Sequence, residues 1–541
     1  MQRTASIAFA LCFFIASFAI AQPSVPQGGV VSAASLLPAG APGYQVAPGS
    51  IVSIFGSNLA TSAGANGVGA SALPLPTSLG GASVTIGGVT AGLFFVSNGQ
   101  INAQVPYTVA LGASVPVVVT TSAGSSSPST VPVVAAAPAI FTYSQNGLGN
   151  AAAQNYVSAG STPANGFTTA IAQGGILIVY GTGGGSLGSS TPANGAACGG
   201  GQFPGSVSAT IAGQSVTVQY AGCAPGFVGL DQWNIQLPNT IPSGCSVPIQ
   251  VSVGGVLSNA ATIAVSSSGN CATAATGQPF AGPGQSLGSV QIINTAISIP
   301  GLFSQTSGSA SGSFQKYGAT AFSNMGGIPP AQAGCFVQTT KSSSSSPSTA
   351  TVLGTTGLDA GTITLKAPSG TYTLTENPTG TYSTAVSGIP ALTAGTYTVT
   401  ATGASGGVGP FTSTLNVPGI LNVTNPGFTG TSFSQSQGLS ATMTCPDPAG
   451  EIVALVLSTT SNNIQGEAIC TFTCSSNIVI PSSVLKQLPV SASGQAEVGY
   501  FFLPPNNNAG VTSAQFTATG LNFGLFYMLN YYFTGNLTLT Q

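Results

Sequence analysis

Alternating apolar and polar positions in the first half of the chain predict β-strands, and one such stretch occurs twice. Residues 99–107 read Gly-Gln-Ile-Asn-Ala-Gln-Val-Pro-Tyr, and residues 231–238 read Asp-Gln-Trp-Asn-Ile-Gln-Leu-Pro, with the shared positions 132 residues apart. Successive side chains of a strand point to opposite faces, so Trp233 faces a core while amides line the other face. These amides are Gln100, Asn102, Gln104, Gln232, Asn234 and Gln236. Because the proline that follows cannot donate to a ladder, each copy is predicted to end there, as the central strand of its own domain.

The regions around the two copies share one plan of short strands. Between residues 28 and 135, runs of Val, Ile, Thr and Phe are separated by Gly, Pro, Ser and Asn, without a helical period. Residues 150–267 repeat this plan, and Gly49–Gly56 corresponds to Gly174–Gly181, 125 residues later. Short strands at such spacing are typical of β-sandwiches of about 100 residues. We therefore expect an all-β fold of tandem immunoglobulin-like sandwiches.

The rest of the chain divides by composition. Gly, Ser and Pro run through residues 272–356 and predict a low-order segment, whereas strand patterns resume after it and only residues 482–488 suggest a helical turn. The predicted division is a signal peptide at 1–21, sandwiches at 22–140 and 141–271, the Gly/Ser-rich segment at 272–356, and β modules at 357–418 and 419–541.

The N-terminus and the distribution of charge indicate export and exclude some classes of partner. Residues 1–21 combine Arg3, an apolar run and an Ala-Ile-Ala cleavage motif, which is the pattern of a secretory signal. No later stretch predicts a transmembrane segment in the mature chain. The mature chain carries four lysines and seven acids, a net charge of −3, and Asp231 is the only charged residue between Gln22 and Cys271. Such a surface cannot neutralise phosphates, so we expect no binding to nucleic acid or to anionic membranes.

Eight cysteines remain once the signal is removed, and an even number in an exported chain predicts disulfides. A hairpin of the strands that precede residue 271 brings Cys245 and Cys271 together. The two other cysteines of this half, Cys198 and Cys223, are then predicted to bond to each other.

The four cysteines of the second half are less constrained by the pattern. Cys470 and Cys474 lie on one predicted strand, about 13 Å apart if it is extended, which is too far for a bond between them. The pairing that we favour there is Cys445–Cys470 with Cys335–Cys474.

Five stretches carry a resemblance to a known family. They begin at Gly29 (Gly-Val-Val-Ser-Ala-Ala-Ser), Ala47 (Ala-Pro-Gly-Ser-Ile-Val-Ser-Ile-Phe-Gly-Ser-Asn-Leu), Leu73 (Leu-Pro-Leu-Pro), Gly99 (the first amide strand) and Ala137 (Ala-Pro-Ala-Ile-Phe). Residues 28–267 thereby resemble the acidobacterial (Solibacter-type) secreted repeat, which is similar to the IPT/TIG branch of immunoglobulin-like domains, although Ser32 stands where that family more often has Asn. Residues 357–541 resemble, more weakly, another uncharacterised exported β module. The repeat family has no established catalytic residues, so the resemblance implies a fold and export.

Three motifs of catalytic or cofactor sites occur without the residues that they need. Residues 183–188 fit the Gly-x-Gly-x-x-Gly dinucleotide fingerprint, but neither a helix nor an acid follows at the required distance, so they predict a loop. Ser186 and Ser286 fit the nucleophile elbow, yet the chain contains no histidine to act as a base. Ser483 and Lys486 fit the S-x-x-K pattern without its companion motifs. We therefore expect no catalytic activity, no cofactor and, without histidine or free cysteines, no zinc.

Two sets of polar residues remain as candidates for a site. Asp447 and Glu451, with Glu467 nearby, form a candidate carboxylate pair for glycoside hydrolysis or a calcium site, although acids in loop-rich regions are more often solvated. The amide rows can bind sugar hydroxyls beside Trp233 or Tyr220, or they can bond to neighbouring backbone, which is the commoner role. Alternation, however, points Trp233 away from the amides.

The sequence thus predicts a secreted or cell-surface protein with a structural or binding role. The alternative is a carbohydrate-binding adhesin, and the third candidate is a glycoside hydrolase that uses Asp447 and Glu451. Sheets usually protect their edges with charge, above all lysine, and residues 22–271 contain none. This predicts self-association, or association with another cell-envelope protein, through contacts that salt does not weaken.

Overall fold

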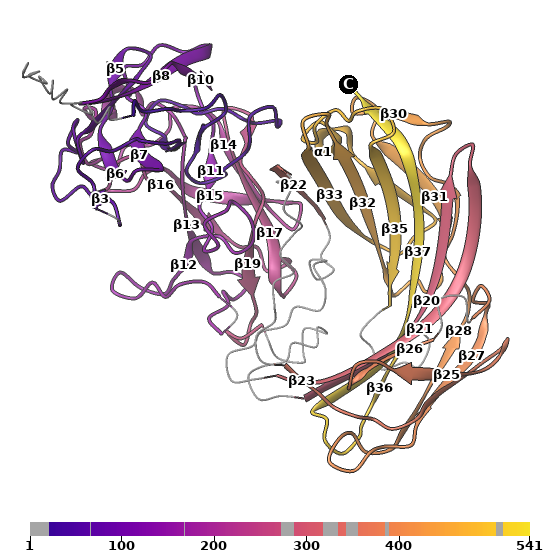
Figure 1. Cartoon of the computed structure of the whole chain (residues 1–541). Helices are drawn as coiled ribbons and strands as arrows, with labels where there is room; N and C mark the ends of the chain where they lie inside the picture. The colour runs from indigo at the N-terminus through magenta and orange to yellow at the C-terminus, as the bar shows by residue number, and fades with distance from the viewer. Residues whose placement is uncertain are drawn as a thin grey trace, which may run out of the picture.

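The computed structural model describes residues 21–64, 66–166, 168–271, 286–317, 334–341, 355–384, 389–504 and 512–541. Apart from residue 21, the predicted signal peptide lies outside these ranges. Regular structure is almost entirely β-strand, which confirms the predicted all-β class. Figure 1 shows the first half of the chain, in indigo to magenta, beside a second half in which long curved strands extend through two lobes.

The first sandwich forms around the first amide strand. One sheet has the order β1 (Val30–Ser32), β2 (Ile51–Phe55), β7 (Gln100–Gln104), β6 (Leu93–Val96) and β3 (Val68–Gly69). The facing sheet has the order β10 (Ser129–Val133), β8 (Gly112–Thr121), β4 (Ala82–Ile86) and β5 (Val89–Thr90), with β9 (Gly124–Ser125) beside β8. Alternate residues of β4 are buried, as one-sided packing requires. Their side chains and those of the amide sheet form a single apolar core.

The second sandwich repeats this arrangement, with one strand shared between its two sheets. Its strand order is β11 (Ala139–Ile140), β13 (Ile176–Thr182), β16 (Asp231–Gln236), β15 (Gln214–Cys223), β14 (Val207–Ile211), β17 (Gly244–Val253) and β18 (Val256–Leu257). Beside this path, β12 (Ala153–Tyr156) pairs with β13, β19 (Ala261–Val265) pairs with β17, and a short 3-10 turn, η1, covers Gly188–Ser190. The start of β15 pairs with β14 and the rest with β16. Trp233 is fully buried in this core, 6.2 Å from the Phe203 ring, so the predicted inward direction is confirmed.

The two sandwiches are joined by polar contacts on the amide sheet of the first. The Ile51 amide donates to Thr182 Oγ1 (2.8 Å), and the Tyr107 amide donates to Asn194 Oδ1 (2.7 Å). The Gly195 amide donates to Gln104 Oε1 (2.6 Å). Asn194 and Gly195 of the long β13–β14 loop thus bond to the first amide strand and the residues just after it, whereas Thr182 bonds to β2 from the end of β13. The insertion in the second copy and the end of β13 together fix how the sandwiches meet.

The second half is built on one extended sheet. Its order is β22 (Gly334–Lys341), β33 (Ile464–Thr473), β32 (Glu451–Thr459), β35 (Ala496–Leu503), β37 (Phe523–Thr540), β20 (Ser286–Ile299), β21 (Phe303–Tyr317), β26 (Thr381–Ser383), β25 (Gly370–Glu376), β24 (Ile363–Ala367), β27 (Gly395–Ala401) and β28 (Phe411–Val417). Off this path, β23 (Thr355–Gly357) pairs with β21, while β30 (Ser432–Ser434) and β36 (Ser513–Phe516) pair with β37. A separate sheet contains β29 (Asn422–Asn425), β31 (Leu439–Thr444) and β34 (Asn477–Ile480), and the short helix α1 covers Ser482–Leu485.

Three strands form within the segment that the composition marks as low-order, so this expectation differs from the structure. The β20–β21 hairpin is paired over its whole length, and β22 lies at one edge of the sheet. Small residues serve close packing here: a Cβ at Gly308 would lie 2.3 Å from the Pro390 carbonyl oxygen. Glycine and serine therefore mark tight contacts in this segment, whereas their frequency alone is typical of a linker.

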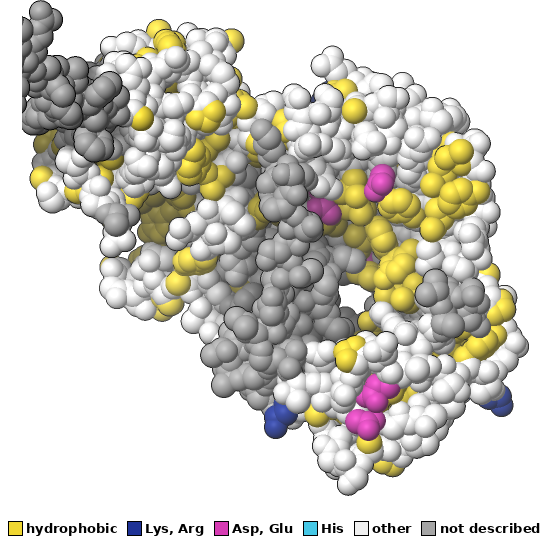
Figure 2. Space-filling view, viewed as in Figure 1, with side chains coloured by type: hydrophobic (Ala, Val, Ile, Leu, Met, Phe, Trp, Pro, Cys, Tyr) yellow, Lys and Arg dark blue, Asp and Glu magenta, His cyan; other side chains and the backbone are white. Residues whose placement is uncertain are grey.

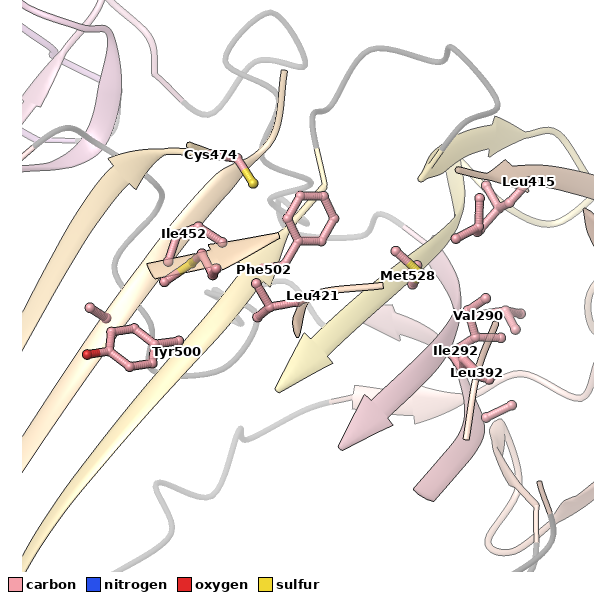
Figure 3. Close-up of a cluster of buried hydrophobic side chains, with 14 of the residues drawn as sticks. Val290, Ile292, Leu392, Leu415, Leu421, Ile452, Cys474, Tyr500, Phe502 and Met528 are labelled. Carbon is pink, nitrogen blue, oxygen red and sulfur yellow. The ribbon is translucent and has the colours of Figure 1, made fainter. Parts of the chain in front are cut away.

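One hydrophobic core spans both predicted C-terminal β modules. Figure 3 shows Val290 and Ile292 near Met528, with Phe502 and Tyr500 further along the same sheet. This core draws side chains from β20 to β37, which is a wider range than either 357–418 or 419–541. The long strands β20, β21 and β37 make it continuous because each extends through both lobes (Figure 1).

Four disulfides stabilise the fold. Cys198 bonds to Cys223 and Cys245 to Cys271, as expected from the hairpin argument. In the second half the favoured pairing was wrong, because Cys335 of β22 lies directly opposite Cys470 of β33, with 4.0 Å between their Cα atoms. The remaining bond joins Cys445 to Cys474. Within the described ranges no helix has the length and apolar character of a membrane span.

Candidate functional site

The second amide strand presents a polar surface on the outer face of its sandwich. Gln232, Asn234 and Gln236 are half-buried, while the alternate residues of β16 are buried. Gln232 Nε2 donates to Asn234 Oδ1 over 2.8 Å. The other polar atoms of this pair, Gln232 Oε1 and Asn234 Nδ2, have no partner among the described residues. One acceptor and one donor thus remain available to a ligand at neighbouring positions.

The same bond recurs in the first sandwich. Gln100 Nε2 donates to Asn102 Oδ1, again over 2.8 Å, and the Ser53 hydroxyl bonds to the same oxygen. Gln100 Oε1 and Asn102 Nδ2 also have no partner within the described ranges. The two sandwiches therefore share a Gln–Asn pair as well as a fold, and in each pair the glutamine Oε1 and the asparagine Nδ2 are the groups without a partner among the described residues.

Aromatic rings lie beside both amide pairs. Tyr180 of β13 is opposite Gln232, and Tyr220 of β15 is opposite Asn234. The tyrosine hydroxyls are held by Gln154 Oε1 (3.0 Å) and the Cys223 carbonyl oxygen (2.7 Å) respectively. Burial raises the pKa of both tyrosines, and the charge of Asp231 adds to this for Tyr220, so both hydroxyls are protonated at neutral pH.

The corresponding ring in the first sandwich is Phe55, which is 39% exposed and lies opposite Gln100. Phe55 and Tyr180 occupy equivalent positions of the two copies. We call the surface formed by Tyr180, Tyr220, Gln232 and Asn234 the amide–tyrosine face.

Two of the predicted amides are already used by the fold. Gln104 is fully buried, and its Oε1 accepts the Gly195 amide of the second sandwich. Gln104 is therefore not accessible to a ligand, because the long loop of the next domain covers it. Gln236 Nε2 donates to the Gly174 carbonyl oxygen, and its Oε1 accepts a bond from Gln219 Nε2 (3.0 Å). The expected bonding to neighbouring backbone thus holds for these two residues and leaves the Gln–Asn pairs free.

The glycine-rich loop at 183–188 surrounds a carboxyl group of the protein itself. The Gly184 amide donates to Asp231 Oδ2 over 2.6 Å. A Cβ at Gly184 would lie 1.9 Å from the Phe203 ring, so only glycine fits. Burial raises the pKa of Asp231 to about 8, although the Gly184 bond opposes the shift. The loop therefore has a structural role between the two sandwiches. It agrees with the sequence prediction of a loop at these residues in place of a dinucleotide site.

The serine motifs show no catalytic partner among the described residues. Ser186 bonds to Thr191 within its own turn, while Ser286 begins β20, where its amide donates to Asn522 Oδ1. Ser483 lies in α1, and Lys486 follows it at the edge of a cavity of about 290 Å³ between the two halves of the chain. Ser483 does not line this cavity.

The predicted acids do not form one carboxylate pair with free oxygens. Asp447 is 9% exposed and both of its oxygens are bonded, to the Ala449 amide (2.9 Å) and to the Thr512 hydroxyl (3.2 Å). Glu451 is half-buried at the start of β32, and burial raises its pKa to about 7. Glu467 accepts a bond from Gln338 Nε2. Within the described residues, no three acidic or cysteine side chains are grouped closely enough to bind a metal ion.

Sequence reasoning missed Tyr180 and the role of Phe55. The signal was present, since both aromatic residues precede the final glycine of the repeated Gly49–Gly56 and Gly174–Gly181 stretches. Only the strand register, however, places each ring opposite the glutamine of the amide strand.

Comparison with known proteins finds tandem β proteins at low similarity. No family model matches the chain, and no curated protein matches it. A surface glycan-binding protein of Prevotella bryantii is 13% identical over 44% of this chain and 41% of its own length, with a TM-score of 0.14. A glycan-binding protein from a xyloglucan utilization locus of Bacteroides uniformis is 12% identical over 68% and 86%, with a TM-score of 0.16. A tetra-tandem repeat of a large adhesion protein is 14% identical over 91% and 95%, with a TM-score of 0.14. At these scores the likeness carries no argument about ligand or partner.

Proposed function

We propose that this chain is an exported surface protein that binds a neutral polysaccharide on the amide–tyrosine face. One observation carries the proposal: among the described residues Gln232 Oε1 and Asn234 Nδ2 have no hydrogen-bond partner, and they lie between two half-buried tyrosines. Sugar hydroxyls both donate and accept, so an adjacent acceptor and donor can bond to neighbouring hydroxyls of one residue. Aromatic rings can contact the apolar face of a sugar ring while the hydroxyls bond to the amides.

The charge distribution favours a neutral ligand. Asp231 is the only charged residue between Gln22 and Cys271, and it is buried. An anionic polymer would find no cation on these sandwiches, and a cationic polymer would find no exposed carboxylate. Selectivity must therefore come from hydrogen bonds and ring contacts.

Export and a surface location are supported by two features. Four disulfides are typical of proteins that fold in an oxidising compartment. The predicted secretory signal leads to the same compartment. The equivalent Gln100–Asn102 pair beside Phe55 supplies a second potential contact, which would raise avidity for a repeating polymer.

A glycan array followed by titration tests the proposal on the full mature chain. We expect binding to at least one neutral polysaccharide, weakened about ten- to a hundredfold by the double change Gln232→Ala and Asn234→Ala, because each lost hydrogen bond contributes about 1 kcal/mol and ring contact is disturbed as well. Gln305→Ala, at an exposed glutamine of β21, is the matched control and should bind as the unmodified chain does. Equal binding by the double variant would exclude this face as the site.

A further inference from the structure

The outer face of the C-terminal sheet carries an apolar strip that lies outside the proposed polysaccharide site. Its centre is Phe501 of β35, whose ring centroid lies 5.1 Å from that of Tyr531 on β37, with 70° between the ring planes. Gly499, two residues earlier on the same face, leaves room for the rings of Phe501 and Phe533, since a Cβ there would lie 2.9 Å and 3.5 Å from them. Leu455 of β32 lies opposite Gly499 and extends the strip.

These side chains are only half-buried although they lie on a sheet face. Leu455, Phe501, Leu503, Tyr531 and Phe533 all retain partial exposure, whereas Val456, Tyr500 and Phe502 on the inner side of β32 and β35 are buried. Tyr532, which lies between Tyr531 and Phe533, is half-buried as well. Figure 2 shows hydrophobic side chains gathered over this part of the second half, with acidic side chains beside them. A group of partly exposed apolar side chains on one sheet face is a candidate binding area. We call these five residues the apolar strip.

Acidic side chains lie at both ends of the apolar strip, and Glu451, whose pKa burial raises to about 7, is ionised at pH 8. Glu497 precedes Gly499 on β35, and Glu451 of β32 lies opposite Leu503. Leu503, which lies opposite Glu451, follows Glu497 on β35. At the usual rise per strand residue, the two ends of the strip are therefore about 20 Å apart. Neither Glu451 nor Glu497 has a hydrogen-bond partner among the described residues, while Glu467 next to the Glu497 end is bonded to Gln338.

The strands that carry and flank the apolar strip, β20, β32, β33, β35 and β37, include neither lysine nor arginine. In this part of the sheet the described residues place a cation only at Lys341, at the end of the edge strand β22 opposite Ile464. A partner with positive charges about 20 Å apart and apolar side chains between them would match both features. Such an arrangement is electrostatic complementarity around an apolar centre, the usual plan of a protein interface.

The shape of the strip favours a peptide over a sugar polymer. A sugar chain needs flat rings on which to stack, whereas Phe501 and Tyr531 meet edge to face and aliphatic leucines occupy both sides. Leucine and isoleucine side chains pack well against such an uneven surface. A helix that spans 20 Å contains about 13 residues, and its width fits across two to three strands.

We propose that the apolar strip docks a cationic amphipathic helix, about 13 residues long, from a partner protein, with its basic residues at Glu451 and Glu497. The helix lies with its apolar stripe on Phe501, Tyr531 and the leucines. This site is independent of the amide–tyrosine face, which lies in another domain and carries no exposed charge.

Calorimetric titration of the mature chain at pH 8 with a 14-residue synthetic peptide of leucine and lysine at helical spacing tests this proposal. We expect saturable one-to-one binding that weakens about tenfold when Glu451→Gln and Glu497→Gln are combined, because two partly exposed ion pairs are lost. The same peptide with glutamate in place of lysine should not bind. Glu376→Gln, on β25 outside the strip, removes one acid elsewhere and should leave affinity unchanged, which shows that net charge alone is not responsible.

Other outcomes overturn the proposal. Unchanged affinity in the double variant, equal binding of the lysine and glutamate peptides, or no binding of the lysine peptide each exclude a cationic helix at this strip. Binding of a chitosan oligomer in place of the peptide would assign the face to a cationic glycan instead. Because Gln retains the size of Glu, thermal unfolding of the double variant should match that of the parent chain and verifies that the fold is intact.

Discussion

The second sandwich should lose stability as pH rises, because its buried carboxyl group must give up a proton. Asp231 is 6% exposed, and burial raises its pKa from 3.8 to about 8. The ionisable groups near it are Tyr107 and Tyr220, whose pKa values are themselves raised, and no cation adjoins it among the described residues. In the folded chain Asp231 is therefore neutral at pH 6, whereas in the unfolded chain it is ionised.

The direction and size of the effect follow from proton linkage. Between pH 4 and pH 8 the folded state binds about one more proton than the unfolded state, so the free energy of unfolding falls as pH rises across this window. Each pKa unit corresponds to about 1.4 kcal/mol, which sets an upper limit of about 6 kcal/mol for the whole window. Local relaxation and entry of water reduce this, and we expect a loss of about 2–4 kcal/mol.

Trp233 makes the measurement specific to this domain, since it is the only tryptophan of the chain and lies in the core of the second sandwich. Urea unfolding followed by its fluorescence should give a lower midpoint at pH 8 than at pH 5. Asp231→Asn keeps the size of the side chain and an acceptor for Gly184, but it cannot ionise. This variant should flatten the dependence on pH and exceed the parent chain in stability at pH 8. A parent midpoint that does not change with pH, or an unchanged slope in the variant, would show that the buried acid is not the cause.

Three further results are expected. Trp233 fluorescence should be blue-shifted and resistant to iodide, and Trp233→Ala should cost about 3–5 kcal/mol in the unfolding of its sandwich; a quenchable tryptophan would contradict its burial. Gly184→Ala should destabilise the same domain by about 1–3 kcal/mol, because the added methyl group overlaps the Phe203 ring; an unfolding midpoint equal to that of the parent would contradict this account. Non-reducing peptide mapping should recover Cys335 linked to Cys470, and a Cys335–Cys474 peptide would contradict the strand register.

The sequence alone predicted the structure correctly where the local alternation of apolar and polar residues matches their burial. In the two amide strands, alternate residues are buried, and the direction of Trp233 follows from that alternation alone. The hairpin argument also located the Cys245–Cys271 disulfide, because β17 and β19 pair, and Cys198–Cys223 then followed as the remaining pair of the first half.

The sequence was insufficient where long-range pairing decides the structure. Cys335 lies opposite Cys470 only because β22 pairs with the edge of β33. The pattern of residues within β22 does not predict which strand it pairs with. Likewise, Phe501 and Tyr531 are 30 residues apart in the chain, so the apolar strip exists only once β35 and β37 pair. The burial of Gln104 depends on a loop of the next domain.

The pairing of β20 with β37 has a consequence for the order of assembly. These strands run parallel, and Ser286 at the start of β20 bonds to Asn522, 236 residues later in the chain. The two sandwiches can close from segments that are close in sequence, and each can fold once its own residues have been synthesised. The C-terminal sheet must instead wait, with the apolar side of β20 uncovered, until β37 has been delivered. Folding of this half should therefore be the slow step and the one most dependent on a chaperone, because distant contacts form late and leave apolar surface open to aggregation.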